Sequence, residues 1–481
     1  MIKTEIIQPI NQLLLSQSKN LKNKIAFSDY KTEITYSELD IKTTHFAKNI
    51  IESGIKKGES IALILPNSVD WIIACFAVLR AGCCIVPISF ESTQDEIGYK
   101  LFDSDAKLVI TTSSNEKNIN EINQLFNIEN KKCFLNKDLN SVGFCFKEFC
   151  IKSSNSIIII DDNIDAASYI VYTSGTTGKP KGVVLTSRSM LWVVASCGIP
   201  IIGMNENDNI LSPLPLFHSY ALNICVLGVL ATGCSEFIIE KFSPQNTLDL
   251  IAQKDFTLIP GVPTMFHYLL ETAKKNKISN LRTILRCASA GAIMPATLNN
   301  QFEKYFKIQL LDGYGITETS TFVTMNWPGK NRKMGSCGIP IPGMTVRIIN
   351  PNNYIDVNPD EEGELICHGP NLMLGYHNKL DETNKVIKNK WYHTGDIGKR
   401  DKNGFITITG RLKEIIIRGG QNISPAEIEE VILQDNQVLD CAVVGISHET
   451  LGEVPLAFLV LRDKNIFNQK QLIDFCTVSL S

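Results

Sequence analysis

The chain has 481 residues, and its 47 basic and 50 acidic side chains nearly balance. That length is ample for two or more domains with separate cores, and the balanced charge gives no reason to expect nucleic acid or an anionic membrane as a partner. Fourteen cysteines are scattered without a CxxC pair or a His/Cys cluster at metal-ligand spacing. This usage favours free thiols in a reducing cytoplasm over a disulfide framework.

The sequence carries no sign of membrane targeting. The N-terminal residues Met1–Glu5 lack the basic-then-apolar layout of a signal peptide. The longest apolar stretches, Met190–Met204 and Ala221–Cys234, are interrupted and too short to span a bilayer. We therefore expect a cytoplasmic protein with no transmembrane segment.

The first part of the chain alternates helix and strand patterns. A helical pattern runs from about Ile34 to Ser53. Ser60–Pro66 is typical of a buried strand, and Asp70–Arg80 is apolar on nearly every face, which predicts a buried helix. The next predicted segments are the strands Cys84–Pro87 and Leu108–Ile110 and a peripheral Asn-, Lys- and Ser-rich stretch, Ser113–Asn155. This alternation predicts an open α/β sheet.

A glycine- and hydroxyl-rich turn then joins two β-favouring runs, Ala167–Val171 and Val183–Thr186. Glycines let backbone N–H groups converge on an anion, and Ser and Thr hydroxyls add donors. Lys179 and Lys181 supply positive charge. The turn therefore predicts a polyphosphate site whose candidate residues are Thr173, Ser174, Gly175, Thr176, Thr177, Gly178 and Lys179.

This turn is not a nucleotide loop of the GxxxxGK[ST] type. Only two residues separate Gly175 from Gly178, and Pro180 follows Lys179 where that motif needs Ser or Thr. The stretch Thr173–Gly182 instead resembles the phosphate loop of the adenylate-forming superfamily, which comprises acyl-CoA synthetases, aryl-CoA ligases, luciferases and peptide-synthetase adenylation domains. The resemblance implies ATP and Mg²⁺ as cofactors and a catalytic role for Lys181.

The motif Pro213–Ser219 places His218 just past the predicted strand Ile210–Leu214. Ligands gather at strand ends in open α/β sheets. In the superfamily this aromatic–His pair borders the substrate carboxylate, which implies a catalytic role for His218. Relatives that activate amino acids carry Asp at this position, so the imidazole implies a fatty, aryl or other simple acid without an α-amino group.

Small residues follow the predicted strand Thr283–Arg286. The sequence before it predicts a buried helix from Ala221, strands at Glu236–Glu240 and Phe256–Pro260, and a helix over Thr264–Lys274 opened by Pro263. Small residues in series allow a flat ring to lie close to the backbone. Relatives place adenine here, which implies nucleotide contacts for Ser289, Ala290 and Gly291.

The motif Asp312–Glu318 is more specific. The glycines that flank Tyr314 let its ring lie flat as a platform for adenine, and Asp312 and Gly313 belong to the same nucleotide-binding segment. Thr317 can donate a hydrogen bond to an α-phosphate oxygen. Glu318 is an oxygen ligand suited to Mg²⁺, and we expect it to hold the metal together with Thr176.

A third element contains Asp396 in Trp391–Asp396 and Arg411 in Gly410–Glu414. A carboxylate and a guanidinium that converge on vicinal hydroxyls can bind ribose, and relatives use these two positions in that way. Lys413 falls where relatives hinge the small C-terminal domain. The segments Gly363–Leu365 and Gly369–Gly375 are expected to form a small antiparallel subdomain without assigned chemistry.

Beyond the hinge, Ile415–Arg418 is expected to be a strand that enters the glycine loop Gly419–Gly420. In relatives that use CoA, this loop lines the pantetheine tunnel, which implies CoA contacts for both glycines. Ser424–Glu427 has the pattern of a capping box with proline at the first helical position, so a helix is expected to about Asp435. Two further strands are expected at Asp440–Gly445 and Pro455–Leu461.

The resemblance covers the chain from about Ile34 onward but departs at its end. Relatives continue through a loop whose lysine contacts the carboxylate and the α-phosphate. Lys464 and Lys470 lie too early to match it. We therefore expect a truncated, mobile small domain, slow adenylation, and thioester formation that persists from a pre-made acyl-AMP.

Together these features predict an α/β fold. It has a large N-terminal domain of open β-sheets flanked by helices plus a small β subdomain (residues 1–411), and a truncated α+β C-terminal domain (residues 412–481). The resemblance implies an ATP-dependent ligase that forms acyl-AMP, releases pyrophosphate and transfers the acyl group to CoA. Two alternatives stay open, namely a ligase that loads an acyl carrier protein and a non-catalytic nucleotide-binding relative.

Overall fold

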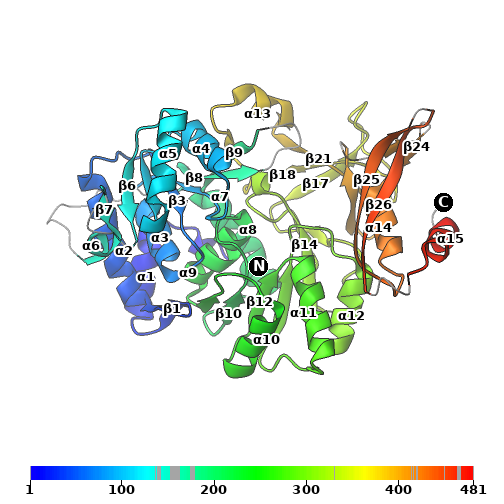
Figure 1. Cartoon of the computed structure of the whole chain (residues 1–481), viewed down its shortest axis with the longest axis horizontal. Coiled ribbons are helices and arrows are strands. Elements are labelled where there is room, and N and C mark those ends of the chain that lie inside the picture. Colours follow the sequence, from blue (N-terminus) through cyan, green and yellow to red (C-terminus); the bar gives the residue numbers. More distant parts are fainter. Residues whose placement is uncertain are drawn as a thin grey trace.

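The computed structural model describes residues 2–135, 137, 142–151, 163–173, 179–329, 331–412, 414, 416–418, 421–448, 450–462 and 467–479. The described chain forms a large domain with three sheets and a small C-terminal domain with one sheet (Figure 1). Several candidate site residues lie outside the described residues: Ser174, Gly175, Thr176, Thr177, Gly178, Lys413, Gly419 and Gly420.

The first large sheet has eight strands in the order β19-β9-β8-β4-β3-β5-β6-β7. Its strands are β3 (Ser60–Ile64), β4 (Cys84–Pro87), β5 (Leu108–Thr111), β6 (Lys131–Phe134), β7 (Phe144–Cys145), β8 (Ala167–Thr173), β9 (Lys181–Thr186) and β19 (Gly375–Tyr376). The antiparallel pair β8–β9 flanks the phosphate-loop sequence, as predicted. The stretch expected to be peripheral supplies β6 and β7, at the edge opposite β19.

The second large sheet has nine strands in the order β16-β15-β14-β13-β12-β10-β11-β1-β2. Its strands are β1 (Ile25–Ser28), β2 (Glu33–Thr35), β10 (Asn209–Ser212), β11 (Ser235–Ile238), β12 (Leu258–Gly261), β13 (Arg286–Ser289), β14 (Gln309–Tyr314), β15 (Thr324–Met325) and β16 (Ile339–Pro340). From β1 through β11, β10, β12 and β13 to β14 the neighbours pair in parallel. The expected open α/β architecture is confirmed.

Helices and short helical turns surround these sheets (Figure 1). The helices of the large domain are α1 (Ile10–Asn20), α2 (Tyr36–Glu52), α3 (Val69–Arg80), α4 (Gln94–Asp103), α5 (Glu116–Phe126), α6 (Phe146–Ile151), α7 (Ser187–Val193), α8 (Ser219–Ala221), α9 (Gly228–Thr232), α10 (Pro244–Gln253), α11 (Pro263–Lys275), α12 (Ala296–Phe306) and α13 (Leu380–Val386). Short turns are η1 (Thr4–Ile6), η2 (Ser113–Asn115) and η5 (Thr317–Thr319), and π-helical segments are η3 (Val194–Ile202) and η4 (Leu222–Leu227).

Local sequence signals account for the predicted helices. Thr35 and Glu38 form a reciprocal capping box at the start of α2, so the helix begins where its orphan N–H groups find partners. Ser68 caps α3, which is buried on nearly every face as its apolar sequence predicts. Gly82, with a φ of 70°, follows the end of α3 in the left-handed region that favours glycine.

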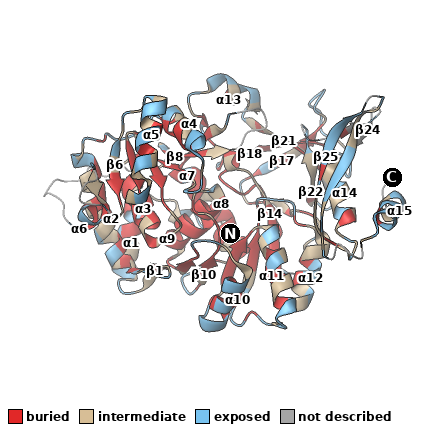
Figure 2. Ribbon diagram, in the orientation of Figure 1, coloured by how far each residue is buried: buried red, intermediate tan, exposed pale blue. Residues whose placement is uncertain are grey.

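The two large sheets share one hydrophobic core. Its main cluster contains Leu63 and Leu185 from the eight-stranded sheet, Ile210 and Leu311 from the nine-stranded sheet, and Trp71 of α3. Figure 2 shows that buried residues concentrate in the large domain, whereas much of the small domain is intermediate or exposed. The scaffold of the large domain is therefore held by burial of apolar surface from both sheets.

The third sheet forms the small β subdomain. It comprises β17 (Thr345–Ile349), β18 (Gly363–His368), β20 (Ile387–Lys388), β21 (Trp391–Arg400) and β22 (Ile406–Arg411). The expected antiparallel subdomain is confirmed for Gly363–Leu365. The prediction is wrong at Gly375, because β19 leaves this subdomain and pairs with β9 of the eight-stranded sheet.

The small domain has a four-stranded sheet in the order β24-β23-β26-β25. Its elements are β23 (Ile416–Arg418), β24 (Gln421–Ile423), α14 (Pro425–Ile432), β25 (Val438–His448), β26 (Gly452–Leu461) and α15 (Gln469–Ser479). Both strands predicted after α14 are present and are longer than expected. Ile416, Val443 and Leu472 contribute to a core that joins the sheet to α14 and α15.

The predicted capping box of α14 is wrong. Pro425 does occupy the first helical position, but no side chain caps this N-terminus. The hydroxyl of Ser424 instead donates to the backbone carbonyl of Thr409 in β22. Ser424 thus ties the start of α14 to the small β subdomain, a contact that local sequence spacing cannot reveal.

None of the helices within the described ranges combines the length and the apolar character that a membrane crossing requires.

Candidate active site

A cavity of about 630 Å³ lies where β13 and β14 end and where the small domain meets the large domain. Its large-domain wall includes Gly291, Asp312, Tyr314, Asp396 and Arg411, and its small-domain wall includes Glu429, Val443 and Glu453. Carboxyl ends of parallel strands are where open α/β sheets bind ligands. The cavity therefore stands at the position that the fold favours for a binding site.

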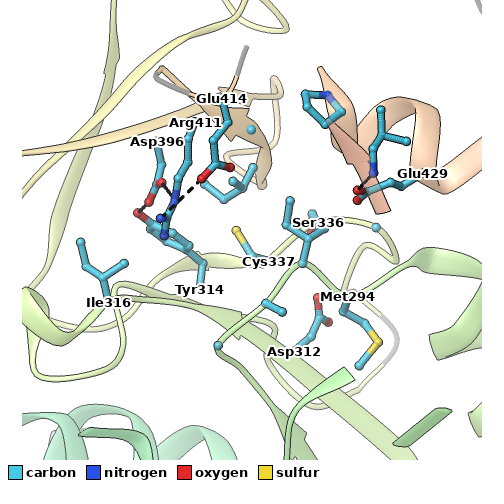
Figure 3. A pocket seen from close by; sticks show the side chains of 18 of the residues that line it. Met294, Asp312, Tyr314, Ile316, Ser336, Cys337, Asp396, Arg411, Glu414 and Glu429 are labelled. Atoms are coloured by element: carbon cyan, nitrogen blue, oxygen red, sulfur yellow. Dashed lines mark hydrogen bonds and ion pairs between the residues drawn. The ribbon is translucent and has the colours of Figure 1, made fainter. Parts of the chain in front are cut away.

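Tyr314, Asp396 and Arg411 form one connected group in this wall (Figure 3). The hydroxyl of Tyr314 donates to Oδ2 of Asp396, and Nε of Arg411 donates to Oδ1 of Asp396 over 3.0 Å. The antiparallel pairing of β21 with β22 sets Asp396 directly opposite Arg411. The structure thus brings together three residues that lie up to 97 positions apart in the sequence.

Burial governs the electrostatics of the two aspartates that line the cavity. Burial raises the pKa of Asp396, while the Tyr314 hydroxyl and the Arg411 guanidinium oppose that rise. Burial raises the pKa of Asp312 to about 7, against a hydrogen bond from Asn326 to its Oδ1 of 2.9 Å. Both carboxyl groups are therefore poised to gain from a ligand that offers hydrogen-bond donors.

The glycines that flank Tyr314 are required by close packing in the structure. A Cβ on Gly315 would stand 1.4 Å from the carbonyl oxygen of Thr321, and a Cβ on Gly313 would stand 2.4 Å from Sδ of Met325. Close approach of neighbouring backbone and side chains therefore requires both glycines. The Tyr314 ring still faces the cavity that it lines.

The small-residue segment is partly in the cavity wall. Ser289 and Ala290 are buried at and just after the end of β13, and neither belongs to the cavity lining. Gly291, with a φ of 86°, turns the chain there and does line the cavity. The predicted strand Thr283–Arg286 is misplaced, because β13 begins at Arg286 and continues through Ser289, where it pairs with β14.

His218 and Thr317 come from different elements that meet beside the cavity. His218 precedes α8, and the next residue, Ser219, places its Oγ 3.5 Å from Oγ1 of Thr317. The residue His218 keeps exposed surface, and its ring packs 4.2 Å from that of Phe217, centroid to centroid. Desolvation by the surrounding protein, with the charge of Lys100, lowers the pKa of His218 and favours the neutral imidazole.

Glu318 is buried directly after Thr317. Its Oε1 accepts a hydrogen bond of 2.9 Å from the hydroxyl of Tyr376. Burial raises the pKa of Glu318, and the hydrogen bond from Tyr376 opposes that rise. A buried carboxylate of this kind gains strongly from a nearby cation.

The described ends of the phosphate loop are fixed by strand pairing. Thr173 at the end of β8 pairs with Lys181 at the start of β9. Lys179 lies 5.5 Å from the ring centroid of Tyr99. Nζ of Lys181 is 2.7 Å from Oε2 of Glu382. Both predicted lysines therefore lie on the C-terminal side of the loop, and Lys181 also approaches the ring of Tyr376.

Sequence reasoning missed Tyr376 and Glu382. The Lys181 ammonium lies 5.0 Å from the Tyr376 ring centroid, so one tyrosine contacts both Lys181 and Glu318. Hydrogen bonds from Lys181 and Lys385 lower the pKa of Glu382 to about 2. Only the pairing of β19 with β9 reveals these contacts. In the sequence, the position of Tyr376 next to Gly375 was a signal that could have pointed to this site, but it is a weak one.

The described residues fit Mg²⁺ only as a partner of phosphate. Within the described ranges no three His, Cys, Asp or Glu side chains gather as a metal cluster. Glu318 offers one buried carboxylate as a metal ligand. In phosphate sites Mg²⁺ is held by one or two carboxylates together with phosphate oxygens and water. The candidate partner Thr176 lies outside the described residues.

The sequence is similar to that of known proteins over nearly its whole length. A long-chain-fatty-acid–CoA ligase from Bacillus subtilis is 30% identical over 480 residues, which cover 94% of this chain and 85% of that protein. A naringenin synthase from Pestalotiopsis fici is 30% identical over 98% of this chain, but the chain spans only 18% of that protein's length. The similarity to the first relative runs nearly end to end.

A solved structure of similar shape is o-succinylbenzoate CoA synthetase from Bacillus subtilis, in complex with the acyl-adenylate intermediate. It superposes with a TM-score of 0.85 at 27% identity, covering 98% of this chain and 92% of that one. The family of AMP-binding enzymes matches residues 14–377, and the AMP-binding enzyme C-terminal domain matches residues 427–481. The expected small domain is therefore present, and the chain belongs to the AMP-binding enzyme family.

Proposed function

We propose that the protein is an ATP-dependent acid–thiol ligase. The carboxylate of an acid attacks the α-phosphorus of ATP, the bond to pyrophosphate breaks, and acyl-AMP forms. A thiolate then attacks the acyl carbonyl and AMP leaves, so that a thioester is the product. The observation that carries this proposal is the connected group of Tyr314, Asp396 and Arg411 in the cavity wall, because it suits an adenosine moiety.

In this proposal the cavity binds the nucleoside. Asp396 and Arg411 hold the two ribose hydroxyls, since a carboxylate accepts hydrogen bonds from them and a guanidinium donates to them. The Tyr314 ring stacks on adenine. The backbone at Gly291 and at Asp312–Gly313 borders the base, with Ser289 and Ala290 behind that surface.

The phosphates are proposed to lie along Thr317, Glu318 and the lysines of the loop. Thr317 donates to an α-phosphate oxygen, and Lys179 and Lys181 neutralise phosphate charge. Mg²⁺, when bound by Glu318 and Thr176, supplies further neutralisation of that charge. No covalent intermediate on the protein is required, so these residues act by positioning the reactants and stabilising charge.

The acid is proposed to lie beside His218. Its lowered pKa favours a neutral imidazole, which can donate one hydrogen bond to a carboxylate and leaves no anion to hold an α-ammonium group. A fatty, aryl or other acid without an α-amino group fits such a site. Two similar proteins from Bacillus subtilis, a long-chain-fatty-acid–CoA ligase and an o-succinylbenzoate CoA synthetase, support this class.

The thiol is proposed to be CoA, which approaches through the side formed by the small domain. We place the boundary between domains at residues 411 and 412, since β22 ends at Arg411 within the small β subdomain and β23 begins a separate sheet. Lys413 is the proposed hinge, and Gly419–Gly420 the proposed contact with CoA. The fourteen free cysteines suit a cytoplasmic location.

The test is exchange of labelled pyrophosphate into ATP with a panel of acids, followed by detection of acyl-AMP by mass spectrometry. We expect exchange with fatty or aromatic acids and little with the α-amino acids. Addition of CoA should convert acyl-AMP into acyl-CoA, and a carrier-bound phosphopantetheine thiol is compared in the same assay. Absence of exchange with every acid would contradict the proposal, and best exchange with an α-amino acid would contradict the role of His218.

A further inference from the structure

Tyr376 is the side chain that joins the phosphate-loop strand to the buried carboxylate. Its hydroxyl donates to Oε1 of Glu318 over 2.9 Å, and the face of its ring lies 5.0 Å from Nζ of Lys181. The three residues come from β19, η5 and β9. One aromatic side chain thus touches a candidate phosphate ligand on its face and a candidate metal ligand at its hydroxyl.

The backbone of Tyr376 is fixed on two sides. It pairs with Val183 in β9, and its N–H donates to Oγ1 of Thr383 in α13 over 2.9 Å. The preceding Gly375 has a φ of 150°, and a Cβ there would stand 2.9 Å from Cγ2 of Thr383. Glycine at that position lets α13 lie close against β19, so the origin of the Tyr376 side chain is held tightly.

The ring of Tyr376 is also fixed. Tyr376 is buried, and the ammonium of Lys181 that covers the ring is itself held by Glu382 at 2.7 Å. A cation over an aromatic face is attracted to the negative face of the ring. The hydroxyl of Tyr376 therefore arrives at Glu318 from a ring that has little freedom to swing away.

A hydrogen bond to one carboxylate oxygen determines how the carboxylate is oriented. The Glu318 side chain has three rotatable bonds, and its Oε1 is the atom that Tyr376 holds. Partners that hydrogen-bond to metal ligands in this way fix the ligand's orientation, and their removal typically costs about 10–100-fold in metal affinity.

We propose that Tyr376 is a positioning residue that orients Glu318 toward Mg²⁺ and so couples metal binding to the strand that carries Lys181. The proposal rests on the proposed function, since it assumes that Glu318 meets Mg²⁺ on bound ATP. Tyr376 itself touches neither the acid nor the reacting phosphorus in this account. Its effect passes through Glu318.

The test uses Tyr376→Phe, which keeps the ring beneath Lys181 and removes only the hydroxyl. The matched control is Tyr392→Phe, because Tyr392 is a buried neighbour whose hydroxyl lies 3.5 Å from that of Tyr376 and, within the described structure, does not hydrogen-bond to Glu318. Binding of α,β-methylene-ATP, whose α–β bridge cannot be cleaved, is measured by calorimetry with EDTA and over a series of Mg²⁺ concentrations.

We expect the Mg²⁺ concentration that gives half of the affinity gain to rise about tenfold in Tyr376→Phe. Binding in EDTA should stay within about twofold of wild type, and Tyr392→Phe should resemble wild type in both conditions. Thr383→Val loosens the Tyr376 backbone without altering its hydroxyl, and it should also raise the Mg²⁺ concentration that gives half of the affinity gain. It replaces Tyr376→Phe in the test if that variant does not fold.

Two results would overturn the inference. One is a Mg²⁺ midpoint in Tyr376→Phe that equals that of wild type, and the other is an equal loss of affinity with and without Mg²⁺, which marks general structural damage. Failure of the wild-type protein to bind the nucleotide at all would instead count against the proposed function. The two failures are therefore distinguishable in one set of titrations.

Discussion

At the scale of single residues, Asp396 is the residue that connects the other members of the proposed nucleotide site. It is almost fully buried, it accepts hydrogen bonds from both Tyr314 and Arg411, and it lines the cavity. A buried carboxylate held by two donors keeps its orientation without a ligand. In the proposed function, this orientation suits hydrogen bonds from the ribose hydroxyls.

We expect Asp396→Asn to weaken ATP binding about tenfold. The amide keeps the size of the side chain but loses the charge, and hydrogen bonds to a charged group contribute about 1.5–3 kcal/mol against about 1 for neutral ones. Calorimetric titration with ATP measures the change. Asp356→Asn, which alters an exposed aspartate paired with Arg347 in the same subdomain, is the control and should bind as wild type.

At the residue scale, three separate motifs were predicted to meet at one site, and their role in nucleotide binding stays a prediction. Tyr314, Asp396 and Arg411 were predicted as parts of one nucleotide site, and the structure does place them together. Tyr376 and Glu382 were not predicted, because their relation to Lys181 arises from the pairing of β19 with β9, across roughly 200 residues of intervening sequence. No local pattern encodes such a pairing.

At the scale of elements, β11 is unusual because this core strand contains a buried ionisable side chain. Glu236 lies within this strand and is fully buried, and the hydroxyl of Ser212 is the polar group that acts on its carboxyl group. Burial raises the pKa of Glu236 well above its ordinary value. The folded state therefore favours the protonated acid.

We expect Glu236→Gln to make the protein more stable at pH 8 than wild type. Because the folded-state pKa is raised, the unfolded chain loses its proton first as pH rises, and wild-type stability falls by up to about 1.4 kcal/mol per pH unit until the folded-state pKa is reached. Glutamine has no such titration. Thermal unfolding from pH 5 to pH 8 should show the gap widening with pH.

The control for this element is Glu240→Gln, which removes an exposed carboxylate just past the same strand, 3.9 Å from Lys31. A surface pair of this kind contributes little, so its pH profile should follow wild type. A wild-type profile in Glu236→Gln as well would mean that Glu236 is solvated in the folded protein.

Element positions were largely predictable, but element partners were not. Apolar runs such as Ser60–Pro66 and Asp70–Arg80 predicted β3 and α3, since buried segments need apolar residues in continuous stretches. The capping pattern at Ser424 failed, because its hydroxyl donates to Thr409 of another sheet instead. A tertiary contact outweighed a local preference there.

At the scale of the whole molecule, the cavity depends on how the small domain rests on the large one. Glu429, Val443 and Glu453 of the small domain line it, and Figure 3 shows Glu429 across the cavity from Tyr314 and Asp396. The two domains are also joined at a second place. Nη1 of Arg462, just past β26, lies 2.5 Å from Oε2 of Glu271 in α11.

We expect Glu271→Gln to release the small domain more often and so to speed limited proteolysis between the domains. Arg462 and Glu271 are both partly exposed, and such ion pairs contribute about 0.2–1 kcal/mol, which corresponds to a cleavage rate roughly 1.5–5-fold faster when the opened form is the one cut.

Lys274→Gln is the matched control, because Lys274 pairs with the same carboxylate from within α11 and its removal leaves the contact with Arg462 in place. Raising the salt concentration should bring wild type toward the variant, since exposed charges are screened. Equal cleavage rates in Glu271→Gln and wild type at low salt would show that the apolar contacts around the cavity, rather than this ion pair, hold the domains together.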